Sequence, residues 1–145
     1  MAVVVREIAC PPERIFRVLQ NGWLFTTWVV GASRMRNVDD AWPAVGSELH
    51  HSFGSWPFVI DDVTTTLEWH PPRRAIFQAK GWPVGEARVQ LDVKPRGDGC
   101  VARLEEHAAK GPGAFVPGAL LDIGLVPRNR ESLRRLAHLA EGGAE

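Results

Sequence analysis

Six segments rich in apolar and β-branched residues lie between Ser33 and Lys110, separated by short runs of Pro, Gly and Asp. This spacing constrains the fold more than any other feature, because short connections join antiparallel strands, whereas a parallel crossover needs a dozen or more residues. The pattern therefore predicts an antiparallel sheet. The expected strands are 33–38, 46–53, 58–69, 75–81, 86–93 and 100–108.

The segment 86–93 shows how such a sheet meets the rest of the protein. Apolar side chains occupy every second position from Ala87 to Val93, and polar side chains occupy the positions between them. A period of two indicates a strand with one buried face and one solvated face. Something must therefore cover the apolar face of the sheet.

The C-terminal segment supplies this cover. Apolar residues recur at helical spacing from Gly118 to Glu141, which predicts a helix of roughly 35 Å, long enough to cross the sheet. Pro127 lies inside this segment and predicts a kink or a break. The Arg residues that follow it, at 128, 130, 134 and 135, are expected on the solvated face.

The N-terminal region adds one strand and two short helices. Val3–Ile8 is short and β-branched, so it predicts a strand before Pro11 and Pro12. A helix is expected to begin near Pro12 and to end at Asn21, and a second one to run from Trp23 to Val30. The sequence predicts an α+β fold in one domain, 1–145.

Composition excludes several classes of protein. The 17 basic and 17 acidic side chains cancel, which argues against nucleic-acid binding and against a polybasic membrane anchor. No apolar run of about 18 residues is present, so we expect no membrane insertion and a cytoplasmic location. Cys10 and Cys100 are then expected to be free thiols. A monomer or a homodimer fits these observations equally well.

Several short motifs occur in a fixed order along the chain: IACPPERIF at 8–16, the helix at 23–28, VGS at 45–47, LEWHPPRR at 67–74, GDGCV at 97–101 and RNRESLRRL at 128–136. Together they resemble the START-like SRPBCC superfamily, which includes the polyketide cyclase/dehydrase and lipid-transport group. The resemblance implies a helix-grip (START/Bet v-like) fold: a curved seven-stranded antiparallel sheet wrapped on a long C-terminal helix, with two short helices between strands 1 and 2. It also implies a cavity between sheet and helix.

Six Trp residues in a chain without Tyr are candidates for an apolar binding site. Trp42, Trp56 and Trp82 each precede Pro in an expected loop, where they could line the mouth of a cavity and stack on a flat ligand. Alternatively, they pack in the core at the ends of the sheet. We assign Trp28, Leu120 and Ile123 on the helices to the same binding site.

Three polar residues are candidates for the cavity wall. Adjacent strand residues face opposite sides, so only one of His50 and His51, and one of Asp61 and Asp62, can point inward. We select His51 and Asp62, together with Glu106 near the end of the last strand, and Arg34 or Arg36 could pair with an inward carboxylate.

His51 and Glu106 are the candidates for proton transfer in catalysis. The alternative for each polar residue is a structural or surface role. No clustered Cys and His set suggests a metal site, and no phosphate-binding loop suggests a nucleotide, so we expect no metal and no cofactor.

These observations support three hypotheses about function. The first is binding of a small hydrophobic molecule, such as a lipid, a polyketide or another flat apolar metabolite. The second, by analogy with the family, is an enzyme of the cyclase or dehydratase type that uses acid–base residues in the same cavity. The third is a partner-protein binding module of the toxin–antitoxin or cochaperone type. The fold alone does not choose among them.

Overall fold

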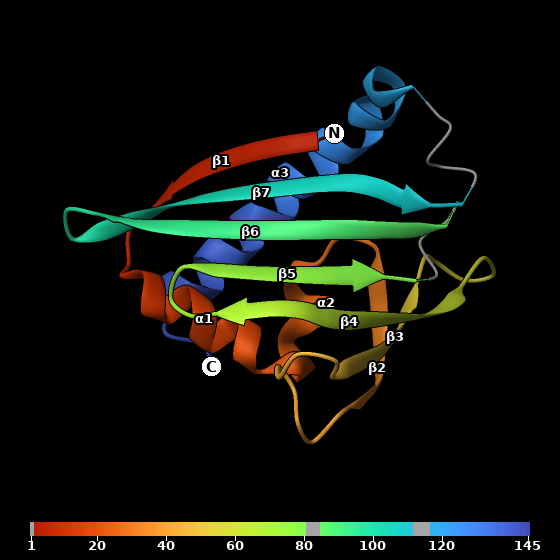
Figure 1. Cartoon of the computed structure of the whole chain (residues 1–145), viewed down its shortest axis with the longest axis horizontal. Coiled ribbons are helices and arrows are strands. Elements are labelled where there is room, and N and C mark those ends of the chain that lie inside the picture. The colour runs from red at the N-terminus through yellow and green to blue at the C-terminus, as the bar shows by residue number, and fades with distance from the viewer. Residues whose placement is uncertain (1, 81–84, 112–116) are drawn as a thin grey trace.

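The computed structural model describes residues 2–80, 85–111 and 117–145. Seven strands in this part of the chain form one antiparallel sheet with the order β1-β7-β6-β5-β4-β3-β2 (Figure 1). The strands are β1 (Ala2–Ile8), β2 (Ala32–Val38), β3 (Glu48–Phe53), β4 (Ile60–His70), β5 (Arg74–Ala79), β6 (Glu86–Arg96) and β7 (Gly99–Lys110). The helices are α1 (Pro12–Gln20), α2 (Phe25–Trp28) and α3 (Gly118–Glu141), with a 3-10 turn, η1 (Gly22–Leu24), before α2.

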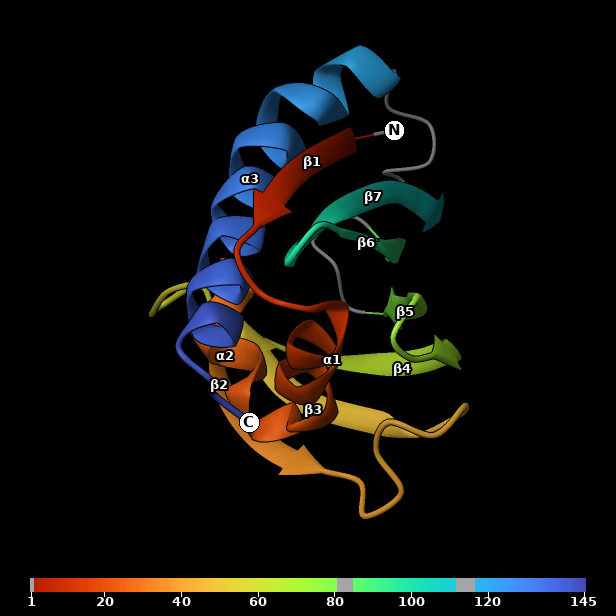
Figure 2. The same ribbon diagram turned by 90° about the vertical axis from the view of Figure 1, so that its left-hand side faces the viewer.

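The sheet is strongly curved, and the helices lie on its concave side. Figure 2 shows α3 running along the opening of this curve, with α1 and α2 near its lower end. Strand β7, from the C-terminal half of the chain, lies inside the sheet, where it pairs with both β1 and β6. This is the helix-grip arrangement that the resemblance implied, with the short helices between β1 and β2 as expected.

The expected elements form with small changes at their ends. The second helix, expected over 23–30, is divided into η1 and α2. Asn21 caps η1 by accepting a hydrogen bond from the Trp23 N–H at 3.1 Å. The last helix is continuous through Pro127, so the expected break does not occur. Pro127 is exposed, so the Ile123 carbonyl that loses its helical donor can be solvated.

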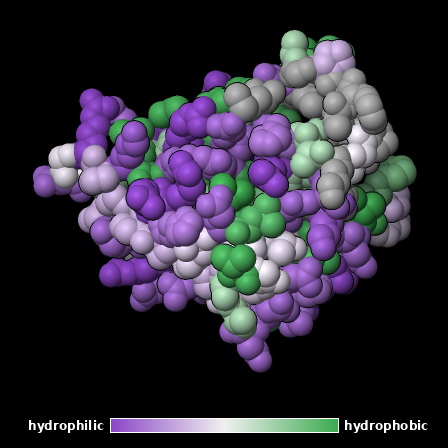
Figure 3. All heavy atoms as spheres, viewed as in Figure 1, coloured by the Kyte–Doolittle hydropathy of each residue, from purple (hydrophilic) through white to green (hydrophobic). Residues whose placement is uncertain are grey.

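The two faces of the sheet differ as the period of two in 86–93 predicted. On β6, Leu91 and Val93 are buried, whereas Arg88 is exposed. The outer face carries ion pairs such as Arg74–Asp92, with 2.6 Å between Nε and Oδ1. Figure 3 shows a mostly hydrophilic surface over this face. The apolar face is therefore the concave one, which the helices cover.

The core lies between the β1–β7–β6 side of the sheet, α1 and α3. Its fully buried side chains include Ile15 of α1, Leu91 of β6, and Leu133 and Leu136 of α3. The core fills the end of the molecule near α1. The remaining space under α3, toward α2 and β3, is where a cavity is left.

Cys10 and Cys100 are free and buried at the junction of β1 and β7, where Ile8 pairs with Cys100. The expectation of free thiols is confirmed. Burial raises the pKa of Cys100 to about 11, and the neighbouring Cys10 adds to this shift. Both thiols are therefore protonated at neutral pH.

Candidate functional site

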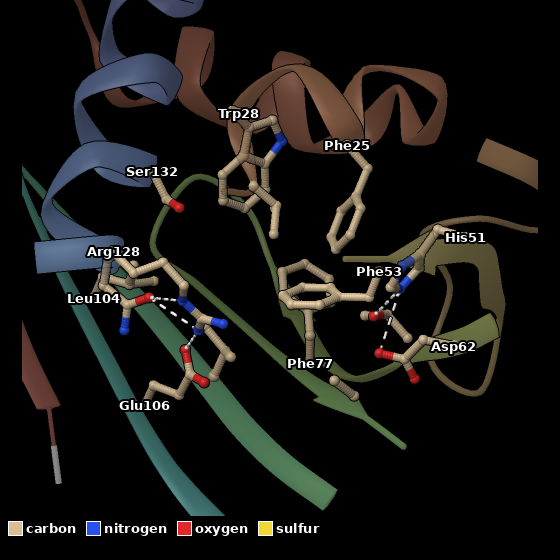
Figure 4. Close-up of a pocket in the computed structure, with 15 residues that line it drawn as sticks. Phe25, Trp28, His51, Phe53, Asp62, Phe77, Leu104, Glu106, Arg128 and Ser132 are labelled. Atoms are coloured by element: carbon tan, nitrogen blue, oxygen red, sulfur yellow. Dashed lines mark hydrogen bonds and ion pairs between the residues drawn. The ribbon is translucent and has the colours of Figure 1, made fainter. Parts of the chain in front are cut away.

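A cavity of about 60 Å³ lies between the sheet, α2 and α3 (Figure 4). Its wall is formed by residues of both helices and of five neighbouring strands, β3 to β7. The cavity therefore exists only when these elements are packed together. Most of the wall is apolar and much of it is aromatic. The main apolar side chains are Phe25, Trp28, Phe53, Phe77, Val89 and Leu104.

His51 of β3 forms one polar end of the cavity. Its side chain is buried, and its Nε2 lies 2.9 Å from Thr64 Oγ1 and 4.0 Å from Asp62 Oδ2. The register of the sheet creates this group, because His51 pairs directly with Asp62 of β4. Phe25 covers the imidazole, with 4.8 Å between the ring centroids.

The protonation state of His51 follows from its burial. Removal from water lowers the pKa of His51, while the Asp62 carboxylate opposes this shift in smaller measure. The imidazole is therefore neutral at pH 7. A neutral imidazole can both donate and accept a hydrogen bond, so it can bind a polar group or move a proton.

Asp62 and Asp61 face opposite sides of β4, as their adjacency required. Asp62 is buried at the cavity, and its Oδ1 accepts a hydrogen bond from the Val63 N–H at 2.7 Å. Asp61 is exposed and lies 3.5 Å from Arg36 Nε. The Arg36 guanidinium also donates to the carbonyl oxygens of His51 and Asp62, at 3.1 and 2.9 Å. Arg36 of β2 is therefore linked by these contacts to both β3 and β4.

Glu106 of β7 forms the opposite polar end. Its carboxylate is buried, and its Oε1 accepts a hydrogen bond from the Arg128 guanidinium of α3. Arg128 also donates to Asn129 Oδ1, at 3.1 Å from Nη2. The Arg128 guanidinium carbon lies 5.9 Å from the centre of the Phe53 ring. The pair thus connects β7 to α3 directly at the cavity wall.

Figure 4 shows how these two ends are separated. His51 and Asp62 lie on one side, Glu106 and Arg128 on the other, and Phe53 and Phe77 lie between them. The arrangement is an apolar chamber with a polar group at each end. Such a chamber can bind a molecule that is apolar along its length and polar at its ends.

Four of the residues assigned to the binding site from the sequence lie elsewhere. Trp42 packs against the core and does not line the main cavity: its Nε1–H donates to the Leu19 carbonyl at 3.1 Å, and its ring stacks on Phe77. Trp56 lies in the β3–β4 hairpin and is 86% exposed. Leu120 and Ile123 are also exposed, because the first turns of α3 project beyond the edge of the sheet (Figure 1).

The other residues assigned to the binding site from the sequence do not all lie in the described part of the cavity wall. Trp28, His51, Asp62 and Glu106 line the cavity. Trp82 lies outside the described residues. Trp42 adjoins a second, smaller hollow of about 10 Å³ beside α2.

Several residues that line the cavity were not among those predicted from the sequence. Arg128 was assigned to the solvated face of α3, but it turns inward to Glu106. Asn129 and Ser132 are buried on the same helical face as the core residues Leu133 and Leu136. Helical spacing from these leucines was the available signal, because positions three and four residues apart share a face.

Comparisons with known proteins agree with the fold described above. The sequence profile of the family described as polyketide cyclase / dehydrase and lipid transport matches residues 2–141. Among curated proteins, no sequence match is found.

Among solved structures, the fold is similar to protein NE0264 from Nitrosomonas europaea, with a TM-score of 0.74, 19% identity, and coverage of 97% of this chain and 93% of that one. It is also similar to protein CV1439 from Chromobacterium violaceum, with a TM-score of 0.70, 19% identity and 96% coverage of both chains. A third is the di-domain ARO/CYC StfQ of the steffimycin biosynthetic pathway, with a TM-score of 0.73 and 12% identity. That match covers 97% of this chain and 50% of StfQ. At these identities the likeness establishes the fold.

Within the described residues, no helix combines the length and the apolar character that crossing a membrane requires.

Proposed function

Because this chain belongs to the polyketide cyclase / dehydrase and lipid transport family, we propose that it binds a small, mainly apolar molecule in the cavity between the sheet and α3. One observation carries the proposal: aromatic and aliphatic side chains from α2 and from four strands, β3, β5, β6 and β7, surround a single void, with buried polar groups at its two ends. A filled core would not need buried polar groups such as His51 and Glu106, whose burial costs free energy.

The size of the cavity limits how the ligand binds. An apolar cavity that holds benzene has a volume of about 150 Å³, whereas this cavity has about 60 Å³. A larger molecule can enter only if wall side chains move. Phe25 and Phe53 are half-buried and line the cavity, so rotation of their rings is the smallest change that would enlarge it. We therefore propose that the structure shown is a closed form that opens around the ligand.

The family description covers both binding for transport and cyclisation, so the ligand itself stays a proposal. Aromatic walls favour a flat molecule, because aromatic rings stack with offset or edge-to-face contacts. A polyketide-like or other flat aromatic metabolite fits this preference better than a single long acyl chain. StfQ, a structural neighbour, is an ARO/CYC protein of a biosynthetic pathway, and this supports the same class of ligand.

Binding can be tested with N-phenyl-1-naphthylamine, a neutral dye that fluoresces strongly in apolar surroundings. The probe should give a saturable rise in fluorescence with the wild-type protein. Ala79→Leu adds side-chain volume at the cavity wall and should weaken binding about fivefold or more, since overlap costs at least about 1 kcal/mol. Ala108→Leu is the matched control, because Ala108 is also half-buried near the same small cluster but does not line the cavity.

The difference in probe binding between Ala79→Leu and Ala108→Leu tests whether the cavity is the binding site. Both should melt as single cooperative transitions before they are compared. Equal binding by the wild type and Ala79→Leu would refute the cavity as the site. No saturable binding by the wild-type protein, either to this probe or to a panel of flat aromatic compounds, would refute the function.

A second candidate function, proton transfer to the bound molecule, is favoured by the His51 group. A neutral imidazole 4.0 Å from a carboxylate and inside an apolar cavity has the properties of a general base. Glu106 is less suited to this role, because one of its oxygens is engaged by Arg128. His51→Phe should abolish turnover of a bound substrate, followed by mass spectrometry, while binding of the neutral probe remains. Unchanged turnover would exclude His51 as the base.

A further inference from the structure

Both ends of the cavity contain polar atoms that lack a hydrogen-bond partner among the residues the structure describes. They are His51 Nδ1 at one end, and Glu106 Oε2 and Asn129 Nδ2 at the other. All three side chains are at least nine-tenths buried, and all three residues line the cavity. A buried polar atom without a partner is unfavourable, so a ligand that supplies the partner gains affinity at that point.

At the α3 end of the cavity, the hydrogen bonds of Arg128 determine which polar atoms are left without a partner. Its guanidinium donates to Glu106 Oε1 and to Asn129 Oδ1. The remaining Glu106 Oε2 can only accept a hydrogen bond, and the remaining Asn129 Nδ2 can only donate one. The end of the cavity therefore offers one acceptor and one donor.

This combination favours a hydroxyl group over a charged ligand group. A carboxylate accepts hydrogen bonds but cannot donate one to Glu106 Oε2, and its charge would be repelled there. An ammonium group donates but cannot accept from Asn129 Nδ2. A hydroxyl group does both, and it is the smallest group that does so, which suits a cavity of about 60 Å³.

At the other end, His51 sets the same requirement. Its Nε2 forms a hydrogen bond with Thr64 Oγ1 at 2.9 Å, so Nδ1 is the ring nitrogen that can bind a ligand. In one tautomer Nδ1 accepts a hydrogen bond, and in the other it donates one. A hydroxyl group serves both tautomers, whereas a ligand carboxylate would be placed close to the Asp62 carboxylate.

We propose that the ligand is an uncharged, flat apolar molecule with a hydroxyl group at each end, one bound by His51 and the other by Glu106 and Asn129. This inference rests on the proposed function, because it assumes that the cavity binds a ligand. It goes further by naming the chemical groups that the protein recognises.

Matched naphthalenes test the inference on the wild-type protein. The compounds are 2,6-dihydroxynaphthalene, 2-hydroxynaphthalene, 2,6-dimethylnaphthalene and naphthalene-2,6-dicarboxylate, and the measurement is displacement of N-phenyl-1-naphthylamine. The methyl compound has nearly the shape of the diol and is more apolar, so a purely apolar site would prefer it. We expect each hydroxyl group to strengthen binding about fivefold to tenfold over methyl, and we expect the dicarboxylate to bind most weakly.

Two variants assign the hydroxyl groups to the two ends. Asn129→Leu and His51→Phe should each weaken binding of the diol about fivefold to tenfold, the contribution of one hydroxyl group, and leave binding of 2,6-dimethylnaphthalene unchanged or stronger. His50→Phe is the control, because His50 is adjacent in β3 but does not line the cavity. The comparison of compounds on the wild type stands even if a variant fails to fold.

The outcomes separate this inference from the proposed function. If the dimethyl compound or the dicarboxylate binds as tightly as the diol, the inference is wrong, but the cavity still binds ligands. If neither the dye nor any naphthalene binds, both the inference and the proposed function are wrong.

Discussion

The ion pair between Glu106 and Arg128 gives a quantitative test of the cavity wall. Arg128→Met keeps an unbranched side chain of similar length but removes the charge. It leaves the Glu106 carboxylate, which is 2% exposed, without its cation. Breaking a buried pair in this way costs about 3–5 kcal/mol. We expect about 3 kcal/mol here, the lower end of that range, because the Arg128 side chain keeps 21% of its exposure and its site is partly hydrated.

Urea unfolding at pH 7 measures this loss. Arg130→Met is the matched control, because Arg130 is exposed two residues further along α3 and should change stability by less than about 0.5 kcal/mol. The double variant Arg128→Met with Glu106→Gln should recover much of the loss, since it removes the uncompensated charge. A loss at Arg128 equal to that at Arg130, or no recovery in the double variant, would refute the account of the α3 end.

Three further predictions concern the rest of the fold. Folding raises the pKa of Cys100 to about 11, above its ordinary value of 9.0, so the folded state holds the proton more tightly. This contribution to stability is present below pH 9 and is lost as the pH rises toward 11, and urea unfolding of Cys100→Ala should show a shallower decline over that window. Both thiols should also react with a maleimide far more slowly in the folded protein than in urea, and fast labelling of the native state would contradict their burial. Leu136→Ala should cost about 2–5 kcal/mol in the same assay, whereas Trp56→Ala should cost less than about 0.5 kcal/mol; similar losses would contradict the assigned burial.

Periodicity predicted the fold because it reports burial directly. The alternation in β6 survives in the structure, with Val89 as an informative exception. Val89 belongs to the apolar set but is only half-buried, because it lines the cavity where no core side chain covers it. A pattern of residue types cannot distinguish an apolar side chain that faces a void from one that faces the core.

The polar ends of the cavity were predicted in part. Adjacency on a strand showed that one residue of each pair must face inward, and the structure places His51 and Asp62 there. Which residue of each pair points inward depends on the register between β3 and β4. Register is a long-range property, and local sequence does not determine it.

The helical part of the site was harder to predict. Arg128 belongs to a run of Arg residues that looks solvated, and only its position opposite Glu106 in three dimensions turns it inward. Leu120 and Ile123 match the apolar spacing of α3 but lie beyond the sheet that would cover them. Helix spacing gives the face of a residue, but not whether another element lies opposite that face.

The most direct test of the central claim is the position of a bound molecule. Intermolecular nuclear Overhauser effects between 2-hydroxynaphthalene and the methyl groups of the protein would provide it. We predict contacts with Val89 and Leu104, which line the cavity between the sheet and α3. Contacts confined to exposed side chains such as Leu120 and Ile123 would place the molecule on the surface and contradict the account.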